Sequence, residues 1–527
     1  MRLKINLRKI SGNCYFEGKI HRGTSFLSTD EITDLFRDVR NTEDITKILS
    51  DMDGFFYLAI ETEEKIFLIT DVVRSYPIFY KISNEEISVV KNAFDLSSAE
   101  KLSTENIDVF FACSYTLGNT TIFQNVYQVE AATVLMVEKT DGKTETTVYY
   151  NPVKLRYQDF EKEKLFSKLN ETYEKVVQRA LNYAAGRTIV VPLSGGYDSR
   201  LIAMTLKKLG AKNVICHAYG VKHFWDIGHL EVRTSQKVAE HLGFKWIFVK
   251  YSYAEWNNFM HEQNTDDCIK YLSGGVATTA YQDWLAISEL KKRNLIPQDS
   301  VFIPGHTGDF LAGSAIPLDV DFGKIYSKKQ IIKTLSKRYF NSFPLTPENA
   351  QKVCTTSVRL NETYSAEDYV RFVENFSWKE FHSKYIANSA QVYNFYGYDW
   401  YYPLWEREVV DLWFSVHPKQ RIGRALYIEF VEKYFKSSIP YVSNGANKNL
   451  FLRIIFKILK ILGFDFLINN QYGISSTNKL SLCLKEIPVF DELNNSFVLK
   501  NSGKRLRKLT VNGLGSLQVL LTVLRKQ

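Results

Sequence analysis

Apolar and polar residues follow each other along the first 150 positions in a pattern that favours short β-strands. The stretch 54–72, GFFYLAIETEEKIFLITDV, holds two apolar runs joined by a charged turn, and 132–150 repeats this pattern around Asp141-Gly142. Short apolar runs separated by such turn residues are typical of β-hairpins. The N-terminal part is therefore predicted to be rich in antiparallel strands.

The pattern changes near residue 155, where apolar residues begin to recur at helical spacing. A long helix is expected first, and short apolar strands then alternate with amphipathic helices. The expected helices are 160–185, 199–210, 231–243 and 283–295, and the expected strands are 187–192, 213–220, 245–251 and 300–304. Alternation of this kind predicts a parallel sheet covered by helices on both faces. Residues 325–527 are expected to be mainly helical.

Size and composition add only a little to the prediction of fold class and function. A chain of 527 residues is too long for one ordinary core, and 45% hydrophobic with 24% charged residues is typical of globular proteins. The six cysteines form no CxxC pair, which argues against a zinc site and a disulfide framework. The start, MRLKINLRKISGN, lacks an apolar signal region, and no run of 18 apolar residues occurs. A cytoplasmic protein is expected.

The stretch VVPLSGGYDSRLIA (190–203) places a Ser-Gly-Gly-x-Asp-Ser motif between a strand and a helix. Two glycines let backbone N–H groups approach phosphate oxygens, and the N-terminus of the following helix favours negative charge. Phosphates repel Asp198 unless a cation lies between them, so a Mg²⁺ ion is expected there. The motif lacks the Gly-Lys-[Ser/Thr] ending of a Walker A loop. A lone Ser-Gly-Gly would be a plain turn, whereas the complete motif favours a nucleotide site.

This loop resembles the pyrophosphate loop of the ATP-pyrophosphatase (PP-loop) superfamily, whose members cleave ATP between the α- and β-phosphates. FIPGHTGDFLAG (302–313) is similar to the asparagine synthetase motif Ser-Gly-Glu-Gly-Ser-Asp-Glu, with Gly305 and Asp309 on its Gly and first Asp. The segment 393–422 resembles the part of that family that closes the synthetase site. The residues that match there are Gly397, Asp399, Pro403, Leu404 and Trp405. The resemblance runs from about 40 to 435.

The resemblance to the asparagine synthetase family implies ATP and Mg²⁺ as cofactors. Asp198 and Asp309 would hold the ion jointly and act in catalysis, and Lys448 would supply the late catalytic lysine, unless it is a solvent-facing lysine. The residues expected to bind ATP are Leu193, Ser194, Gly195, Gly196, Asp198, Ser199, Tyr219, Gly220 and Gly305.

Three positions depart from the asparagine synthetase pattern. His306 stands where the family has an acidic residue, Phe310 where it has a Glu, and Ala315 where it has a Tyr. The first acidic residue belongs near the activated carboxylate and the amine. Its replacement leaves the ATP chemistry in place but weakens the case for aspartate as the substrate.

The stretch 49–83 resembles the glutaminase domain of class II amidotransferases. Gly54, Asp71, Pro77 and Tyr80 match, which implies an Ntn-hydrolase-like β-sandwich flanked by helices. That family uses an N-terminal cysteine whose own amine is the general base. Position 2 is Arg2, and Cys14 lies inside the chain. A retained scaffold without glutaminase activity is expected, with nitrogen from ammonia, a primary amine, or a partner glutaminase.

Three domains are predicted: 1–152, amidotransferase-like; 153–440, asparagine synthetase-like and ATP-binding; and 441–527, a basic helical extension. The fold class is thus α/β and α+β. Within the extension, Arg453, Lys457 and Lys460 fall on one helical stripe, which fits either peripheral contact with the inner face of a membrane or a core-facing helix. No nucleic-acid partner is expected, because no RNA-binding module is recognisable. A homodimer stays open.

The resemblance to the asparagine synthetase family implies an ATP-dependent amide-forming ligase. It would activate a small-molecule carboxylate as an acyl-adenylate and transfer ammonia or an amine to it. Aspartate and a uronic acid are both open as substrates, because relatives with a Gly-Tyr-Asp/Glu-Trp-x-x-Pro-Leu-Trp segment are associated with surface polysaccharide synthesis. The alternative is a degenerate synthetase homologue that acts as a scaffold or regulator.

Overall fold

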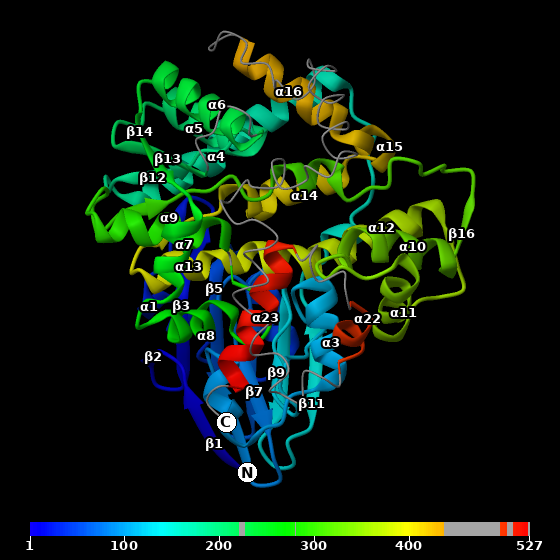
Figure 1. Cartoon of the computed structure of the whole chain (residues 1–527). Helices are drawn as coiled ribbons and strands as arrows, with labels where there is room; N and C mark the ends of the chain where they lie inside the picture. The colour runs from blue at the N-terminus through cyan, green and yellow to red at the C-terminus, as the bar shows by residue number, and fades with distance from the viewer. Residues whose placement is uncertain (221–226, 280, 437–495, 503–509, 525–527) are drawn as a thin grey trace.

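The computed structural model of the chain describes residues 1–220, 227–279, 281–436, 496–502 and 510–524 (Figure 1). Two β-sheets make up the N-terminal part, at the lower end of the view in Figure 1. The larger sheet has the order β11 (Thr144–Val148), β10 (Thr133–Glu138), β6 (Lys65–Thr70), β5 (Asp53–Glu61), β3 (Cys14–Arg22) and β2 (Lys9–Ser11), with β4 (Ser25–Phe26) on β3. The smaller sheet has the order β1 (Arg2–Asn6), β8 (Glu86–Val90), β7 (Phe79–Ile82) and β9 (Tyr127–Gln128).

The central strand β5 is buried on both faces, because each face packs against a different layer. Phe56 and Leu58 join a core with Ile32 of α1 (Thr29–Leu35) and Ile45 of α2 (Thr42–Leu49). Tyr57 and Ala59, which alternate with these residues along the strand, face the smaller sheet instead. Alternate residues of a strand point to opposite faces, so one strand serves both cores. The N-terminal part is thus a β-sandwich flanked by helices, as predicted.

A five-stranded parallel sheet forms the second half of the fold. Its order is β14 (Lys245–Lys250), β13 (Val214–Gly220), β12 (Ile189–Pro192), β15 (Val301–Phe302) and β18 (Asp399–Trp400). The helices α4 (Lys162–Ala184), α5 (Tyr197–Lys208) and α6 (Ile227–Leu242) lie on one side in Figure 1, and α9 (Tyr281–Lys292) and α13 (Ala390–Phe395) on the other. The connections between strands also carry α7 (Tyr253–Met260) and α8 (Thr265–Ser273). The predicted α/β class is confirmed.

The strand order contains a switch point between β12 and β15. From β12 the chain continues to β13 and β14 on one side, and then returns to add β15 and β18 on the other. In open α/β sheets, ligands bind where the connections leave the carboxyl ends of the strands in opposite directions. The loops that follow Pro192 and Phe302 therefore frame the expected binding crevice.

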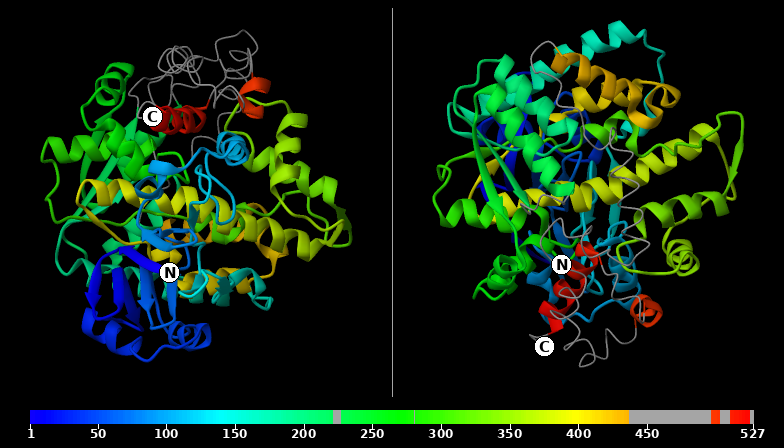
Figure 2. Two further views of the ribbon diagram at one scale, coloured as in Figure 1. Left: turned by 90° about the horizontal axis from the view of Figure 1, so that it is seen from below. Right: turned by 45° about the horizontal axis from the view of Figure 1, so that its top comes forward.

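The remaining described chain is mainly helical, as predicted. Figure 2 shows the yellow-green helices α10, α11 and α12 extending to one side of the molecule. The elements of this part are the hairpin β16 (Ile325–Ser327) and β17 (Thr363–Ser365), and the helices η3 (Phe310–Ser314), α10 (Lys328–Tyr339), α11 (Pro347–Ser357), α12 (Ala366–Phe376), η4 (Ser377–Ile386), η5 (Ala387–Ser389), η6 (Pro403–Trp405), α14 (Arg407–Ser415), α15 (Pro418–Arg421), η7 (Ile422–Arg424) and α16 (Ala425–Lys436).

The two halves are joined by buried ion pairs. Lys19 of β3 lies 3.1 Å from Asp399 of β18 and over the ring of Trp400. Arg179 of α4, fully buried, pairs with Glu406 and donates to the carbonyl oxygen of Gly23. Removing one partner of a buried ion pair leaves an uncompensated charge, so such pairs hold the halves in one arrangement.

Two C-terminal helices, α22 (Phe497–Ser502) and α23 (Val511–Leu524), pack onto the body of the protein. Asp108 of α3 (Thr104–Cys113) accepts hydrogen bonds from the first turn of α22, and α23 contacts α3 and α8. Leu517, Leu520 and Leu521 of α23 are buried, so this helix faces a core. The basic stripe at 453–460 lies outside the described residues, as does the predicted boundary at 440. No helix among the described residues is long and apolar enough to span a membrane.

Candidate functional site

The Ser-Gly-Gly loop is held open by its own two hydroxyl groups. The backbone N–H of Ser194 donates to Oγ of Ser199 at 3.0 Å, the two Oγ atoms lie 3.1 Å apart, and the N–H of Gly196 donates to Oγ of Ser194 at 3.1 Å. Gly196 is the N-cap of α5 and offers no side chain to the first turn. The first N–H groups of the helix thus remain available to an anion such as a phosphate.

The loop after β15 touches the Ser-Gly-Gly loop through Gly305. A Cβ atom at this position would lie 2.4 Å from the backbone nitrogen of Ser199 and 2.6 Å from the carbonyl carbon of Asp198. Only glycine permits this approach without moving one of the loops. The structure therefore brings together two motifs that are about a hundred residues apart in the sequence.

The carboxylates of Asp198 and Asp309 lie close to each other at the switch point. Oδ2 of Asp198 accepts a hydrogen bond from the backbone N–H of Asp309 at 3.1 Å. Burial, and then the negative charge of Asp309, raise the pKa of Asp198 to about 7. The oxygen atoms of these two side chains form a site that suits Mg²⁺, which binds proteins through one or two carboxylates together with substrate phosphates. The residues present thus fit the implied ion.

Two further residues, Tyr427 and Arg424, complete the site and were missed from the sequence. The Tyr427 hydroxyl donates to Oδ1 of Asp198 at 2.5 Å, and Nη1 of Arg424 lies 3.5 Å from Oδ2 of Asp309. Both come from η7 and the start of α16, beyond the segment that carried the resemblance to a closing element. The basic run KQRIGR before an amphipathic helix was the only available signal, and basic residues in such runs are common on protein surfaces. Lys448, the predicted catalytic lysine, lies outside the described residues.

Four of the residues expected to bind ATP, Leu193, Tyr219, Gly220 and Gly305, resemble positions that surround the adenosine in the asparagine synthetase family; the first three lie at the carboxyl ends of β12 and β13, and Gly305 follows β15. The N–H of Leu193 donates to the carbonyl oxygen of His217 at 2.8 Å, which places Tyr219 and Gly220 at the same edge of the sheet. The ring of Tyr219 is stacked on Tyr251, with centroids 5.0 Å apart. An aromatic pair at this edge offers a flat surface for a base. The roles assigned to these four residues stay predictions.

The three departures from the asparagine synthetase pattern have different structural consequences. Burial lowers the pKa of His306 to about 4, so its imidazole is neutral at physiological pH. Its Nδ1 is buried without a hydrogen-bond partner among the described residues. Phe310 is stacked on His382 with centroids 4.1 Å apart, and Ala315 is also buried. The first departure thus exchanges a negative charge for a neutral ring, whereas the other two serve packing.

The segment that resembles a closing element connects the synthetase half to the N-terminal half. Asp399 is bound by Lys19, by Arg187 at 3.1 Å and by the Tyr183 hydroxyl at 2.6 Å. Further along, the ring of Trp405 lies beside that of Phe310, the first residue of η3, with centroids 5.8 Å apart. The segment therefore spans from the sandwich to the neighbourhood of Asp309.

The N-terminal sandwich holds no cysteine with the properties of a nucleophile among its described residues. Arg2 is hydrogen-bonded within the smaller sheet, where its N–H donates to the carbonyl oxygen of Glu85 at 2.7 Å. Cys14 lies inside β3, is 3% exposed, and burial raises the pKa of its thiol to about 11. A nucleophilic cysteine needs a lowered pKa and access to substrate. Cys14 has neither property.

Comparison with known proteins places the chain in a family. The profile described as asparagine synthase matches residues 168–435, while the comparison with curated proteins finds no match. Solved structures with detectable likeness include an allosteric regulatory enzyme of purine biosynthesis (9% identity, TM-score 0.19) and glutamine phosphoribosylpyrophosphate amidotransferase from B. subtilis (7%, 0.19). The U34-tRNA thiolase NcsA from Methanococcus maripaludis also has such likeness (14%, 0.20).

The likeness to these structures is partial. The aligned regions cover 45%, 57% and 45% of this chain, and 60%, 63% and 81% of the three relatives, in that order. The chain thus spans less than two thirds of the first two relatives, and TM-scores this low support no conclusion about function. The profile match, in contrast, extends over half of the chain and includes Asp198, Asp309 and Tyr427. The chain belongs to the asparagine synthase family, which implies the use of ATP.

Proposed function

We propose that the chain is an ATP-dependent amide-forming ligase. One oxygen of a substrate carboxylate attacks the α-phosphorus of ATP, the bond to the β-phosphate breaks, and pyrophosphate leaves. Ammonia or an amine then attacks the acyl carbon of the resulting acyl-adenylate, AMP leaves, and an amide remains. The observation that carries the proposal is the meeting of Asp198 and Asp309 beside the Ser-Gly-Gly loop at the switch point.

Each part of the site has a task in the first step. The N–H groups at the start of α5 and the hydroxyls of Ser194 and Ser199 bind the pyrophosphate end of ATP. Asp198 and Asp309 would hold Mg²⁺, which when bound neutralises the charge that develops on the leaving pyrophosphate. Arg424 faces the same carboxylates and can donate to a phosphate oxygen.

Two classes of acid are proposed as the substrate that is activated: aspartate and a uronic acid. Aspartate carries an α-ammonium group that a negative side chain would hold, and His306 offers a neutral ring at the position concerned. This exchange favours a carboxylate without an ammonium group, such as a uronic acid. Aspartate is the reference substrate against which the uronic acid has to be compared.

The nitrogen is proposed to come from free ammonia, an amine or a separate glutaminase rather than from this chain's own sandwich. The buried, undissociated thiol of Cys14 supports this. Release of glutamate from glutamine by the purified chain would contradict this part of the proposal and would leave the ligase part intact.

The decisive experiment measures AMP formation and ATP–pyrophosphate exchange by the full chain. Aspartate, glucuronate and galacturonate are each supplied with ammonium and Mg²⁺. Asp198→Asn and Asp309→Asn are each expected to lower exchange by about a hundredfold or more, while Asp319→Asn, which changes an exposed carboxylate, leaves it unchanged. If the chain neither binds ATP nor exchanges pyrophosphate with any acid, it is a degenerate scaffold and the proposal is wrong.

A further inference from the structure

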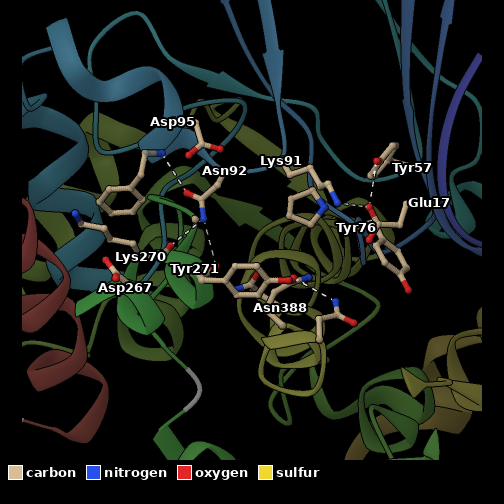
Figure 3. Close-up of a pocket in the computed structure, with 15 residues that line it drawn as sticks. Glu17, Tyr57, Tyr76, Lys91, Asn92, Asp95, Asp267, Lys270, Tyr271 and Asn388 are labelled. Atoms are coloured by element: carbon tan, nitrogen blue, oxygen red, sulfur yellow. Dashed lines mark hydrogen bonds and ion pairs between the residues drawn. The ribbon is translucent and has the colours of Figure 1, made fainter. Parts of the chain in front are cut away.

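A second pocket lies between the two halves of the protein, away from the Ser-Gly-Gly loop. It has a volume of about 330 Å³, within the roughly 300–1,000 Å³ of small-molecule sites. Its walls come from the sandwich, from α8 and from the stretch around α13 (Figure 3). No residue of the loops 193–199 or 303–309 lines it. Any ligand of this pocket is therefore distinct from the ATP bound by the synthetase half.

Aromatic rings with fixed orientation form part of the wall. Tyr271 is 41% exposed, and its ring packs against Phe395 with centroids 5.4 Å apart. Tyr76 is stacked on Trp400, also at 5.4 Å. In Figure 3 Tyr271 lies near the centre of the view, and Tyr76 lies to its right. Such rings offer flat apolar surfaces for the C–H face of a ligand.

The amide side chains of the wall turn their N–H donors toward the protein. Nδ2 of Asn92 donates to the carbonyl oxygen of Lys270 at 3.0 Å, Nδ2 of Asn388 to that of Leu272 at 2.7 Å, and Nε2 of Gln391 to that of Ser75 at 3.0 Å. For Oδ1 of Asn388, the described residues supply no donor. The amides are thus locked in place, and one of them keeps a free acceptor.

The carboxylates of the wall add further acceptors. Glu17 is oriented by the Tyr57 hydroxyl and the Lys91 ammonium, which both bind its Oε2, while no donor from the described residues binds its Oε1. The carboxylate of Asp95 forms no hydrogen bond or ion pair with the described part of the chain, although its backbone N–H donates to the carbonyl oxygen of Asn92. The pocket therefore offers fixed acceptor oxygens on several sides of a space bounded by aromatic rings, and it requires a ligand with several donors.

The charge of the wall narrows the class of ligand. Three carboxylates, Glu17, Asp95 and Asp267, face two lysines, Lys91 and Lys270, so the formal charge is −1. Since one lysine is already paired with Glu17, a phosphate or a free carboxylate would meet more repulsion than attraction. Hydroxyl groups on a ring match planar amide and carboxylate acceptors, and the C–H face of the same ring matches Tyr271 and Tyr76.

We propose that this pocket binds a neutral saccharide, one or two pyranose rings in size. The ring stacks on Tyr271, its hydroxyls donate to Asn388, Glu17 and Asp95, and Lys91 and the tyrosine hydroxyls donate to its oxygens. The inference does not depend on the ligase chemistry, because the pocket shares no residue with the ATP loops.

The test uses the full chain without ATP, so its result is independent of the proposed ligase activity. Saturation-transfer NMR and calorimetry are run with methyl glucoside, methyl galactoside, N-acetylglucosamine and maltose, and with glucuronate, putrescine and inorganic phosphate as comparison probes. At least one neutral sugar is expected to bind in the millimolar range, and more tightly than the three charged probes. A charged probe that binds more tightly than every sugar would overturn the proposal, and so would the absence of any sugar binding.

Two variants connect the binding to the pocket. Tyr271→Ala removes an exposed ring and is expected to weaken sugar binding by about tenfold or more. Tyr127→Ala, which removes a ring of similar exposure (36%) from the sandwich, serves as the matched control. Asp95→Ala, on an exposed residue, provides a second variant that does not rely on the ring. Binding that is unchanged in both pocket variants, or equally reduced in the control, would show that the sugar binds elsewhere.

Discussion

The hydroxyl of Tyr427 donates a 2.5 Å hydrogen bond to Oδ1 of Asp198, across 229 residues of sequence. Asp198 is thus bound by two donors before any cation is present, because the backbone N–H of Asp309 donates to its other oxygen. Both hydrogen bonds favour the ionised carboxylate and oppose the effects of burial and of the Asp309 charge. The protonation state of one side chain therefore depends on elements from three parts of the fold.

The affinity for Mg²⁺ is expected to depend on pH through Asp198. Because its pKa is raised to about 7, the carboxyl is protonated below that pH and must lose a proton to bind a cation. The apparent Mg²⁺ affinity should fall by up to about tenfold for each pH unit below 7 and level off above it. Tyr427→Phe removes a donor that lowers the pKa, so the fall should begin at higher pH. Mg²⁺ titrations of pyrophosphate exchange between pH 5.5 and 8.5 measure this, and Tyr434→Phe in the same helix is the control.

The stability of the metal-free protein should also report on Asp198. Its pKa in the folded state lies above its ordinary value of 3.8, so its stabilising contribution is complete at acid pH and is lost as pH rises toward 7. Asp198→Asn keeps both hydrogen bonds, since Oδ1 can accept from the Asp309 N–H and the Tyr427 hydroxyl can accept from Nδ2. The variant should therefore gain roughly 1–3 kcal/mol in free energy of unfolding at pH 8, and little at pH 4.

Asp198→Asn should also lower pyrophosphate exchange by about a hundredfold or more. Denaturant unfolding at the two pH values, without Mg²⁺ and with the exchange assay beside it, separates the two effects. Asp319→Asn supplies the control for stability as well. A variant that is less stable than the parent at pH 8 would show that the two carboxylates do not repel each other in the metal-free protein.

The strands and loops of the site could be predicted from the sequence because each depends on local chemistry. The Ser-Gly-Gly turn, the β-branched strand before it and the glycine at 305 all leave a signal within a few residues. The Tyr427 hydrogen bond leaves none, because it depends on how α16 is oriented over the sheet. That orientation follows from tertiary contacts such as the edge-to-face pairs of Tyr427 with Trp413 and of Phe430 with Phe166. A pocket whose walls come from two halves of a chain cannot be predicted from the sequence either, because it also depends on tertiary contacts.

Gly305→Ala tests whether the close approach of the two loops is required. The added Cβ would lie 2.4 Å from a backbone nitrogen, so one loop must move, and a displacement of about 1 Å at a reacting centre can cost about a hundredfold in rate. We expect pyrophosphate exchange to fall by this order. Gly323→Ala is the matched control, because its Cβ would meet only the Asp321 side chain, at 3.4 Å. Full exchange in Gly305→Ala would mean that the loops separate during turnover.

The buried pair of Arg421 and Glu374 is expected to determine whether the C-terminal part of the site assembles at all. Both side chains are fully buried and joined by two hydrogen bonds of 2.6 and 3.1 Å, and Arg421 also binds the carbonyl oxygens of Val416 and Leu311. Glu374→Gln leaves the guanidinium charge uncompensated and should cost about 3–5 kcal/mol in free energy of unfolding. Lys164→Gln, which breaks an exposed pair, should cost less than about 0.5 kcal/mol. Leu311 lies two residues after Asp309, and Arg421 lies three residues before Arg424, so the pair connects both segments of the metal site. The Mg²⁺ affinity of Glu374→Gln should therefore fall together with its stability. Denaturant unfolding and metal titration measure the two effects. A stable variant with unchanged metal affinity would show that the pair does not position Asp309.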